Sequence, residues 1–256
     1  MRVAIIGTGN IAKSFGSVIA SNGVDIAFIL GRDFGRTKQV ADQFNSPFST
    51  DVSHLPSDLD MYLCCVNDDA IIQIVNSLSF TLTKAQVIIH FSGSISSSVL
   101  ASKSKNYGVV WPIQSIHDGE DWMDATVVVT ASNNIANNAI NGLLSNLTSN
   151  CISSSDDQRL KMHLVAVILN NFTYYLFEQT YQYCDKQEID ITNFKAILQT
   201  TFQSMMDGDI GKLTGPARRG DLSTISRHKE ILQSDSVLLE LYTCITENIL
   251  KKYENP

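Results

Sequence analysis

The sequence has no run of about 18 consecutive apolar residues, the length that a transmembrane helix needs, so we expect no membrane span. It has no C-x-x-C pair, and its five cysteines and five histidines are dispersed along the chain. Because a metal site needs clustered ligands, we expect no metal centre. The odd number of scattered cysteines indicates reduced, mostly buried thiols. The first residues lack the long apolar region of a signal peptide, and we expect a cytoplasmic protein.

Positive charge is also in the minority. The chain has 19 Lys and Arg residues against 26 Asp and Glu residues, which gives a net charge of −7, and it has no basic tail. This balance argues against nucleic acid or an anionic membrane as the main partner. With 256 residues, 44% of them hydrophobic, the chain can bury a sizeable core in one large or two ordinary domains.

The first 150 residues alternate short apolar runs with segments of helical pattern. Strands are predicted at residues 2–6, 24–30, 61–66, 87–91, 109–111 and 126–130, and helices at 12–20, 38–44, 70–78 and 131–147. Continuous apolar strands separated by helices are typical of a parallel sheet that is covered on both faces. The sequence therefore predicts an α/β fold with a Rossmann-like, mostly parallel, doubly wound sheet.

The character of the chain changes after the polar stretch at 153–157, where we place a domain boundary. The two predicted domains are residues 1–152, which bind the cofactor, and residues 153–256, which are all-helical. Residues 158–183 contain no Gly or Pro, and apolar residues fall on nearly all faces, as in a helix buried by a core or an interface. Further helices are predicted at 191–206 and 223–250. The apolar surface of residues 160–177 favours a homodimer.

The most informative motif follows the first predicted strand directly. Its sequence is Gly7-Thr8-Gly9-Asn10-Ile11-Ala12, a G-x-G-x-x-A turn between a strand and a helix. Gly7 permits the tight turn, Gly9 lets the backbone approach a pyrophosphate, and Ala12 is small enough for close helix packing. The helix N-terminus offers unpaired N–H groups to phosphates. We expect all six residues to bind a dinucleotide.

The residues after the second strand bear on the choice between NAD and NADP. An acidic residue there binds the ribose 2′-hydroxyl of NAD, whereas the planar fork of an Arg pairs with the 2′-phosphate of NADP. Here the order is Gly31-Arg32-Asp33, with Arg36 a turn later. We expect NADP, bound through Arg32. NAD is the less favoured cofactor and would be selected if Asp33 faces the ribose, and a solvated turn is the remaining alternative.

Further ligand contacts are expected where later strands end, because open parallel sheets bind ligands beyond the carboxyl ends of their strands. Val66 and Asn67 end the strand at 61–66 and are predicted near the nicotinamide. Ser92 and Ser94 follow the next strand and can hydrogen-bond a ligand. His90 has either a structural or a catalytic role.

Two groups of polar residues are candidates for catalysis. His163 lies in the long apolar helix, with Asn170 and Asn171 broadly on the same face. These three residues form either ligand contacts or a structural network, since buried polar groups need partners. The second group, Arg218, Arg219, Thr224 and His228, follows a Gly-Pro turn and would suit an anionic group and a proton exchange. A helix-capping loop is the alternative for this group.

The chain resembles a bacterial family that joins a Rossmann-like, NADP-oxidoreductase-type domain to a helical domain of unknown function. The resemblance rests on the glycine turn and then, in order, on His90-Phe91-Ser92-Gly93-Ser94, Trp111-Pro112-Ile113-Gln114, residues 163–171 and Thr214-Gly215-Pro216-Ala217-Arg218-Arg219-Gly220-Asp221. More broadly the chain looks like the superfamily of 6-phosphogluconate dehydrogenase, β-hydroxyacid dehydrogenases and pyrroline-5-carboxylate reductase. This implies a 6-phosphogluconate dehydrogenase C-terminal-like helical domain, a substrate between the domains and dimerisation through the helices.

The catalytic Lys of the β-hydroxyacid enzymes is not carried over, because Lys161 lacks their glycine-rich lead-in. The first hypothesis is an NADP-dependent oxidoreductase that transfers hydride to or from a small carbonyl, imine or hydroxy acid. His163 is its leading proton donor, Asn170 or Asn171 orients the substrate, and Arg218 and His228 are the second choice for an anionic substrate. A non-catalytic dinucleotide-binding sensor or regulatory protein is the alternative, which an absence of hydride turnover would favour.

Overall fold

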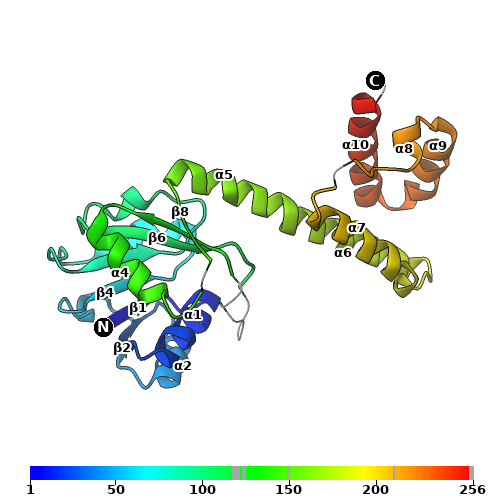
Figure 1. Ribbon diagram of the computed structural model, residues 1–256. Helices are drawn as coiled ribbons and strands as arrows, with labels where there is room; N and C mark the ends of the chain where they lie inside the picture. Colours follow the sequence, from blue (N-terminus) through cyan, green and yellow to red (C-terminus); the bar gives the residue numbers. More distant parts are fainter. Residues whose placement is uncertain (117–121, 123–124, 149, 210, 254–256) are drawn as a thin grey trace. The chain divides into compact units, whose positions relative to one another are not determined.

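The structure is a computed structural model that describes residues 1–116, 122, 125–148, 150–209 and 211–253. It divides the chain into two compact units, Met1–Ala166 and Val167–Pro256 (Figure 1). The first unit extends past residue 152, so it includes the helix that begins at Asp156. The boundary at 152/153 stays a prediction about function, because compactness alone does not test it.

The first unit is built on an eight-stranded sheet with the order β3-β2-β1-β4-β5-β6-β7-β8. Its strands are β1 (Arg2–Ile6), β2 (Asp25–Leu30), β3 (Phe48–Ser49), β4 (Met61–Cys64), β5 (Val87–His90), β6 (Tyr107–Pro112), β7 (Val127–Ala131) and β8 (Cys151–Ser153). All neighbouring strands are parallel except β6 and β7, which are antiparallel. The order of β3 to β6 is that of a Rossmann sheet, which confirms the predicted fold class.

The helices of this unit are α1 (Asn10–Ser21), α2 (Phe34–Phe44), α3 (Asp68–Ser77), α4 (Asn134–Leu144) and α5 (Asp156–Ala166), with 3₁₀ turns at Val52–His54 and Ser97–Leu100. Helices α1, α2 and α4 cover one face of the sheet, where Phe15, Val40 and Ile140 pack on the strands (Figure 1). Helix α3 covers the other face through Ile71 and Val75. Apolar side chains are thus buried on both faces, and this burial is the main stabilising term of the unit.

Helix α5 packs at one end of the face that α3 covers. Its residues Met162 and Ala166 contact a small apolar cluster of Val109, Trp111 and Val128 from β6 and β7. This cluster lies where β6 ends. Helix α5 is therefore at the same end of the sheet as the loops that follow β4 and β5.

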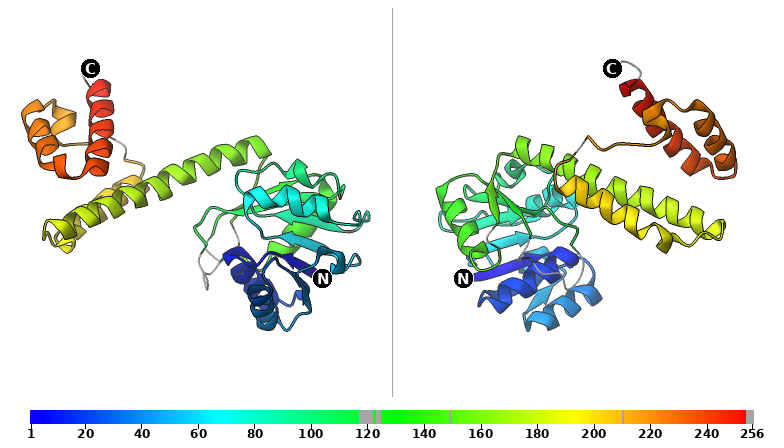
Figure 2. Two further views of the ribbon diagram at one scale, coloured as in Figure 1. Left: turned by 180° about the vertical axis from the view of Figure 1, so that it is seen from behind. Right: turned by 45° about the vertical axis from the view of Figure 1, so that its right-hand side comes forward.

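The second unit is helical. It contains a π-helical turn at Val167–Phe172, α6 (Thr173–Lys186), α7 (Lys195–Met206), α8 (Pro216–Arg219), α9 (Leu222–Ile231) and α10 (Ser236–Tyr253), with 3₁₀ turns at Ile191–Phe194 and Leu232–Ser234. Helices α6 and α7 form a hairpin, and α8 and α9 pack against α10 (Figure 2). Among the described residues no helix is long and apolar enough to cross a membrane.

The predicted single helix at 223–250 is wrong, because the structure has two helices there. Asp235 interrupts the segment: its side chain accepts the backbone N–H of Leu238 at 3.2 Å and its carbonyl accepts that of Leu239 at 3.0 Å. Aspartate favours this capping geometry over a helix interior, since its short side chain competes for backbone N–H groups. Strands β3 and β8 were not predicted, because two or three residues leave no readable pattern.

Candidate functional site

The glycine turn lies where β1 ends and α1 begins. Gly7 has φ +123°, and a β-carbon there would stand 2.1 Å from the carbonyl oxygen of Cys65, so only glycine fits. Gly9 has an ordinary φ of −80°, and a β-carbon there would meet nothing within 4 Å. The space in front of Gly9 is therefore open to a ligand, as a pyrophosphate cradle requires.

The first turn of α1 provides backbone donors beside that space. Gly9 is the N-cap of α1 and has no side chain that could cap it. The first intrahelical hydrogen bond runs from the N–H of Lys13 to the carbonyl oxygen of Gly9, at 3.2 Å. The N–H groups of Asn10, Ile11 and Ala12 precede this bond, and such groups at a helix N-terminus can bind phosphate. Asn10 uses its side-chain amide to hold the carbonyl of Ile116 at 3.1 Å.

The end of β2 separates the roles of the two charged residues that follow it. Asp33 caps α2, because its carboxylate accepts the backbone N–H of Arg36 at 2.8 Å. Arg32 and Arg36 are exposed, and neither forms an ion pair within the described residues. One oxygen of the carboxylate that would favour NAD is thus engaged with the helix, and both guanidinium groups lie exposed beside it.

The end of β4 adjoins the glycine turn, and β5 is the next strand of the sheet. The backbone of Val66 abuts Gly7, and Asn67 is exposed as the N-cap of α3 without a side-chain cap bond. Ser92 is buried, and its hydroxyl accepts the N–H groups of Ser94 at 3.1 Å and of Ile95 at 3.0 Å. The Ser92 hydroxyl therefore shapes the loop that follows β5, and the half-buried Ser94 donates its hydroxyl to the Asp68 carboxylate at 2.6 Å.

His90 is fully buried at the end of β5. Its Nδ1 accepts the backbone N–H of Ser92 at 3.2 Å. Burial, and then the nearby Arg159, lower the pKa of His90 from 6.5 to about 4, so the ring is neutral at neutral pH. The structure therefore assigns His90 a role in holding the loop.

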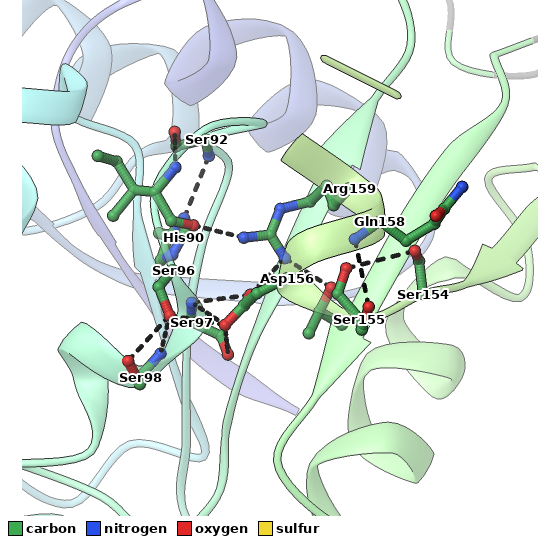
Figure 3. Close-up of polar contacts among 12 residues, drawn as sticks. His90, Ser92, Ser96, Ser97, Ser98, Ser154, Ser155, Asp156, Gln158 and Arg159 are labelled. Carbon is green, nitrogen blue, oxygen red and sulfur yellow. Dashed lines mark hydrogen bonds and ion pairs between the residues drawn. The ribbon is translucent and has the colours of Figure 1, made fainter. Parts of the chain in front are cut away.

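A buried polar cluster fastens α5 to the same loop (Figure 3). Arg159 is fully buried and pairs with Asp156 at 2.8 Å, and it donates to the Thr130 hydroxyl at 2.6 Å and to the Ile95 carbonyl oxygen. Asp156 also accepts the Ser96 hydroxyl at 2.6 Å and the Ser97 N–H at 3.0 Å. The start of α5 is thereby tied to β7 and to the segment after β5.

Two turns after this cluster begins, His163 lies against the loop. Its ring centroid is 5.5 Å from that of Trp111, and a β-carbon at Gly93 would stand 2.4 Å from its Cδ2 atom. Gly93 is thus required for the imidazole to approach the end of β5. His163 is half-buried, whereas Lys161 is exposed and pairs with Asp157 at 2.7 Å.

The remaining predicted residues belong to the second unit. Asn170 and Asn171 lie in the π-helical turn, both exposed, and the Asn170 amide donates to Asn171 at 3.1 Å. His228 contacts the Tyr242 hydroxyl through Nδ1 at 2.9 Å, and the Arg218 guanidinium stacks over Tyr253 at 3.8 Å. His163 alone among the catalytic candidates lies in the first unit, so a joint role for the five candidates stays a prediction.

Sequence reasoning missed the residues that support His163. The motifs quoted above include Gly93 and Trp111, but neither was predicted as a site residue. Asp156 belongs to the predicted polar boundary and Arg159 to the helix predicted after it. The i, i+3 spacing of Asp156 and Arg159 was a usable signal for an ion pair. Its burial was not readable, because it depends on the tertiary position of α5.

Comparison with known proteins gives two matches along the chain. Residues 1–87 match the oxidoreductase family with an NAD-binding Rossmann fold, and residues 125–249 match a domain of unknown function, DUF2520. The chain joins a Rossmann oxidoreductase domain to a DUF2520 domain. This confirms the resemblance inferred from the motifs. The DUF2520 match begins at Ala125, so β7, α4, β8 and α5 of the first compact unit fall within it. No curated protein sequence matches the chain.

Solved structures share the fold over nearly the whole chain. The proposed NADP oxidoreductase BF3122 from Bacteroides fragilis has 21% identity and a TM-score of 0.84, with 98% of both chains covered. A reductive aminase from Aspergillus terreus, solved with NADPH and ethyl-5-oxohexanoate, has 11% identity and a TM-score of 0.75, with 98% of this chain and 94% of that chain covered. A 1-pyrroline-5-carboxylate reductase from Streptococcus pyogenes has 15% identity and a TM-score of 0.60, with 98% of both chains covered.

Proposed function

We propose that the protein is an NADP-dependent oxidoreductase that transfers hydride to or from a small carbonyl, imine or hydroxy acid. The observation that carries this proposal is the position of His163, held against Gly93 and Trp111 at the carboxyl ends of β5 and β6. The glycine turn lies at the same edge of the same sheet. A proton donor and a dinucleotide cradle at one sheet edge are the two parts that such chemistry needs.

The residues present fit a dinucleotide. Gly9 faces open space, the N–H groups of Asn10, Ile11 and Ala12 precede the first helical bond of α1, and Asn67 has no cap bond at the end of β4. Arg32 would hold the 2′-phosphate and Val66 and Asn67 would line the nicotinamide side, with Ser92 shaping the loop beside them. When bound, the cofactor supplies the hydride.

The preference for NADP follows from the end of β2. Because Asp33 caps α2 and Arg32 is unpaired within the described residues, NADPH should bind more tightly than NADH. Calorimetry with both cofactors measures this, and Arg32→Ala should remove most of the preference. Lys38→Ala, which removes a cation from the exposed face of α2, is the matched control. Tighter binding of NADH, or an unchanged preference in Arg32→Ala, would contradict the assignment.

His163 is proposed to hand a proton to the substrate or take one from it, since an imidazole can do either at neutral pH. The neighbours described as a reductive aminase and a 1-pyrroline-5-carboxylate reductase support carbonyls and imines as the first substrate panel. Once turnover of NADPH is found, His163→Ala should lower kcat by about 10²–10⁴-fold. His54→Ala, a change at an exposed histidine of the same unit, should leave kcat unchanged. Loss of activity in His228→Ala with His163→Ala active would reverse the ranking.

We also propose that the substrate contacts Asn170, Asn171 and Arg218. The same assay tests this, because loss of a substrate contact should change KM. The non-catalytic alternative predicts tight NADPH binding with no hydride transfer to any member of the panel.

The five free thiols support the proposal of a cytoplasmic location, which fractionation of cells expressing the native chain would test.

A homodimer is proposed because the long helix carries exposed apolar side chains. Leu169, Phe172 and Tyr174 of the second unit are 68%, 62% and 70% exposed, and exposed large apolar side chains that gather on one segment favour a protein interface. One chain has a mass of 28.2 kDa, and light scattering at micromolar concentration should give twice that mass. A mass of one chain would contradict it.

A further inference from the structure

We propose that the second unit contains its own oxyanion site, which binds a carboxylate or phosphate group carried on a small apolar body. The site is a hollow of about 720 Å³ between α8 and the end of α10. Leu213, Ala217, Leu250 and the Tyr253 ring supply apolar walls, and Arg218 and Arg219 supply positive charge. This inference rests on the proposed role of Arg218 as a substrate contact and names the chemical group that Arg218 would bind; its test needs no dinucleotide at the site of the first unit.

The first argument is the unbalanced charge of the hollow. Neither Arg218 nor Arg219 forms an ion pair with any carboxylate in the part of the chain that the structure describes. Lys252 adds a third cation, with its Nζ atom 5.4 Å from the centre of the Tyr253 ring. Two cations, Arg218 and Lys252, lie at the Tyr253 ring, and Arg219 lines the same hollow. In a chain with a net charge of −7, such a group of cations without a paired carboxylate among the described residues indicates a site for an external anion.

The second argument is the position of Arg218. Its guanidinium carbon lies 3.8 Å above the centre of the Tyr253 ring. A guanidinium held over a ring in this way keeps N–H groups at its edge that can bond to a ligand. An edge of parallel N–H groups matches the two oxygens of a carboxylate or of a phosphate.

The third argument concerns the carboxylate of Asp221, which follows the two arginines in the sequence. It accepts the backbone N–H of Thr224 at 3.0 Å, the Thr224 hydroxyl at 2.7 Å and the Ser223 hydroxyl at 3.0 Å. These bonds, with a smaller effect of Arg219, hold the pKa of Asp221 below its ordinary value. Asp221 is therefore engaged as the cap of α9, and Arg218 has no internal partner of this kind.

The backbone keeps the two arginines in place. Gly215 has φ +99° before Pro216, and Gly220 has φ +69° as the C-cap of the short helix α8. Both angles favour glycine, so the four residues between them form one turn with defined ends. The hollow lies within the size range of small-ligand sites, and its mixed walls favour an anion with an apolar part over a bare ion.

The test uses the full-length protein without dinucleotide, and isothermal titration with hexanoate, acetate and inorganic phosphate at constant ionic strength. Wild type should bind hexanoate or phosphate saturably, with acetate weaker than hexanoate if the apolar walls contribute. Arg218→Gln should weaken binding about 10- to 100-fold, the loss expected for a charge-assisted hydrogen-bond pair. Arg218→Lys keeps the charge but loses the planar fork, so its affinity should lie between that of wild type and that of Arg218→Gln. Whether hexanoate or phosphate binds more tightly assigns the carboxylate or the phosphate as the natural group.

Two control variants make the result specific. Arg227→Gln removes an exposed arginine of α9 outside the hollow and should bind as wild type does. Arg32→Ala changes the proposed cofactor site and should leave the Arg218-dependent binding intact, which separates this proposal from the proposed function. Absence of saturable binding to all three probes, or equal binding by wild type and a folded Arg218→Gln variant, would overturn the proposal. An equal loss in Arg227→Gln would also overturn it, because binding would then reflect general charge.

Discussion

The buried ion pair at the start of α5 should be a principal determinant of the stability of the first unit. Arg159 is 1% exposed at its side chain and Asp156 is 32% exposed, and their 2.8 Å contact is supported by bonds to Thr130, Ile95, Ser96 and Ser97. Asp156→Asn keeps the shape but leaves the guanidinium buried without a counter-charge. Removal of one partner of a buried pair costs about 3–5 kcal/mol.

Arg159→Met should cost somewhat less. It leaves the Thr130 hydroxyl and the Ile95 carbonyl without their donors, at about 1–3 kcal/mol for each buried unsatisfied group. Asp156 is a third exposed and keeps its serine donors, so its charge is not stranded. The buried Thr130 hydroxyl contributes about 1–3 kcal/mol and the part-buried Ile95 carbonyl about 1 kcal/mol, so the expected loss is about 2–4 kcal/mol. Lys161→Met is the matched control, since it removes an i, i+4 pair whose side chains are 65% and 76% exposed, and should change stability by less than about 0.5 kcal/mol.

Urea unfolding followed by tryptophan fluorescence measures these values for the right part of the chain, because both tryptophans, Trp111 and Trp122, lie in the first unit. The carboxylate adds a pH test. Burial raises the pKa of Asp156, but the bonds from Ser96, Ser97 and Arg159 outweigh it and hold the pKa below 3.8. The advantage of wild type over Asp156→Asn should therefore be full above pH 3.8 and shrink as the pH falls below it. A cost for Asp156→Asn no larger than that for Lys161→Met would refute the reasoning.

Two further predictions concern the loop after β5. Because the pKa of His90 falls from 6.5 to about 4 on folding, the free energy of unfolding should rise by up to about 3 kcal/mol between pH 4 and 6.5, and His90→Asn should flatten this rise in urea titrations. An equally steep profile in the variant would show that another group titrates. Gly93→Ala places a methyl group 2.4 Å from the His163 Cδ2 atom and 2.7 Å from the Trp111 ring. The variant should therefore have a shifted Trp111 fluorescence spectrum and a lower kcat. A wild-type spectrum with wild-type turnover would contradict the proposed position of His163.

The sheet was predictable from the sequence because its core strands are continuous apolar runs. Val87–His90 and residues 127–130 are buried on both faces, and such strands are readable without tertiary information. The glycine turn was readable for a different reason: the φ of Gly7 and the close approach of Cys65 admit no other residue, so the motif records a steric requirement.

The surroundings of His163 were only partly predictable. The sequence placed it on a helix, but its contact with Gly93 and Trp111 depends on where α5 packs, and that position is fixed by the Arg159 cluster through residues far apart in the chain. The role of Asp33 was undecidable from sequence for a similar reason. Its identity suited either a ribose contact or a helix cap, and only the bond to the Arg36 N–H distinguishes them.

The most direct test of a dinucleotide site at the glycine turn is calorimetric titration of wild type and Gly9→Ala with NADPH. Gly9 has φ −80° and open space in front of it, so the variant should fold with wild-type stability in urea. Its added methyl group would stand where the pyrophosphate approaches the backbone. Loss of one charge-assisted bond corresponds to an affinity roughly 10- to 100-fold weaker. Wild-type binding of NADPH together with this loss in a stable Gly9→Ala variant is the predicted result, and equal affinity of the two proteins, or no binding by wild type, would contradict it.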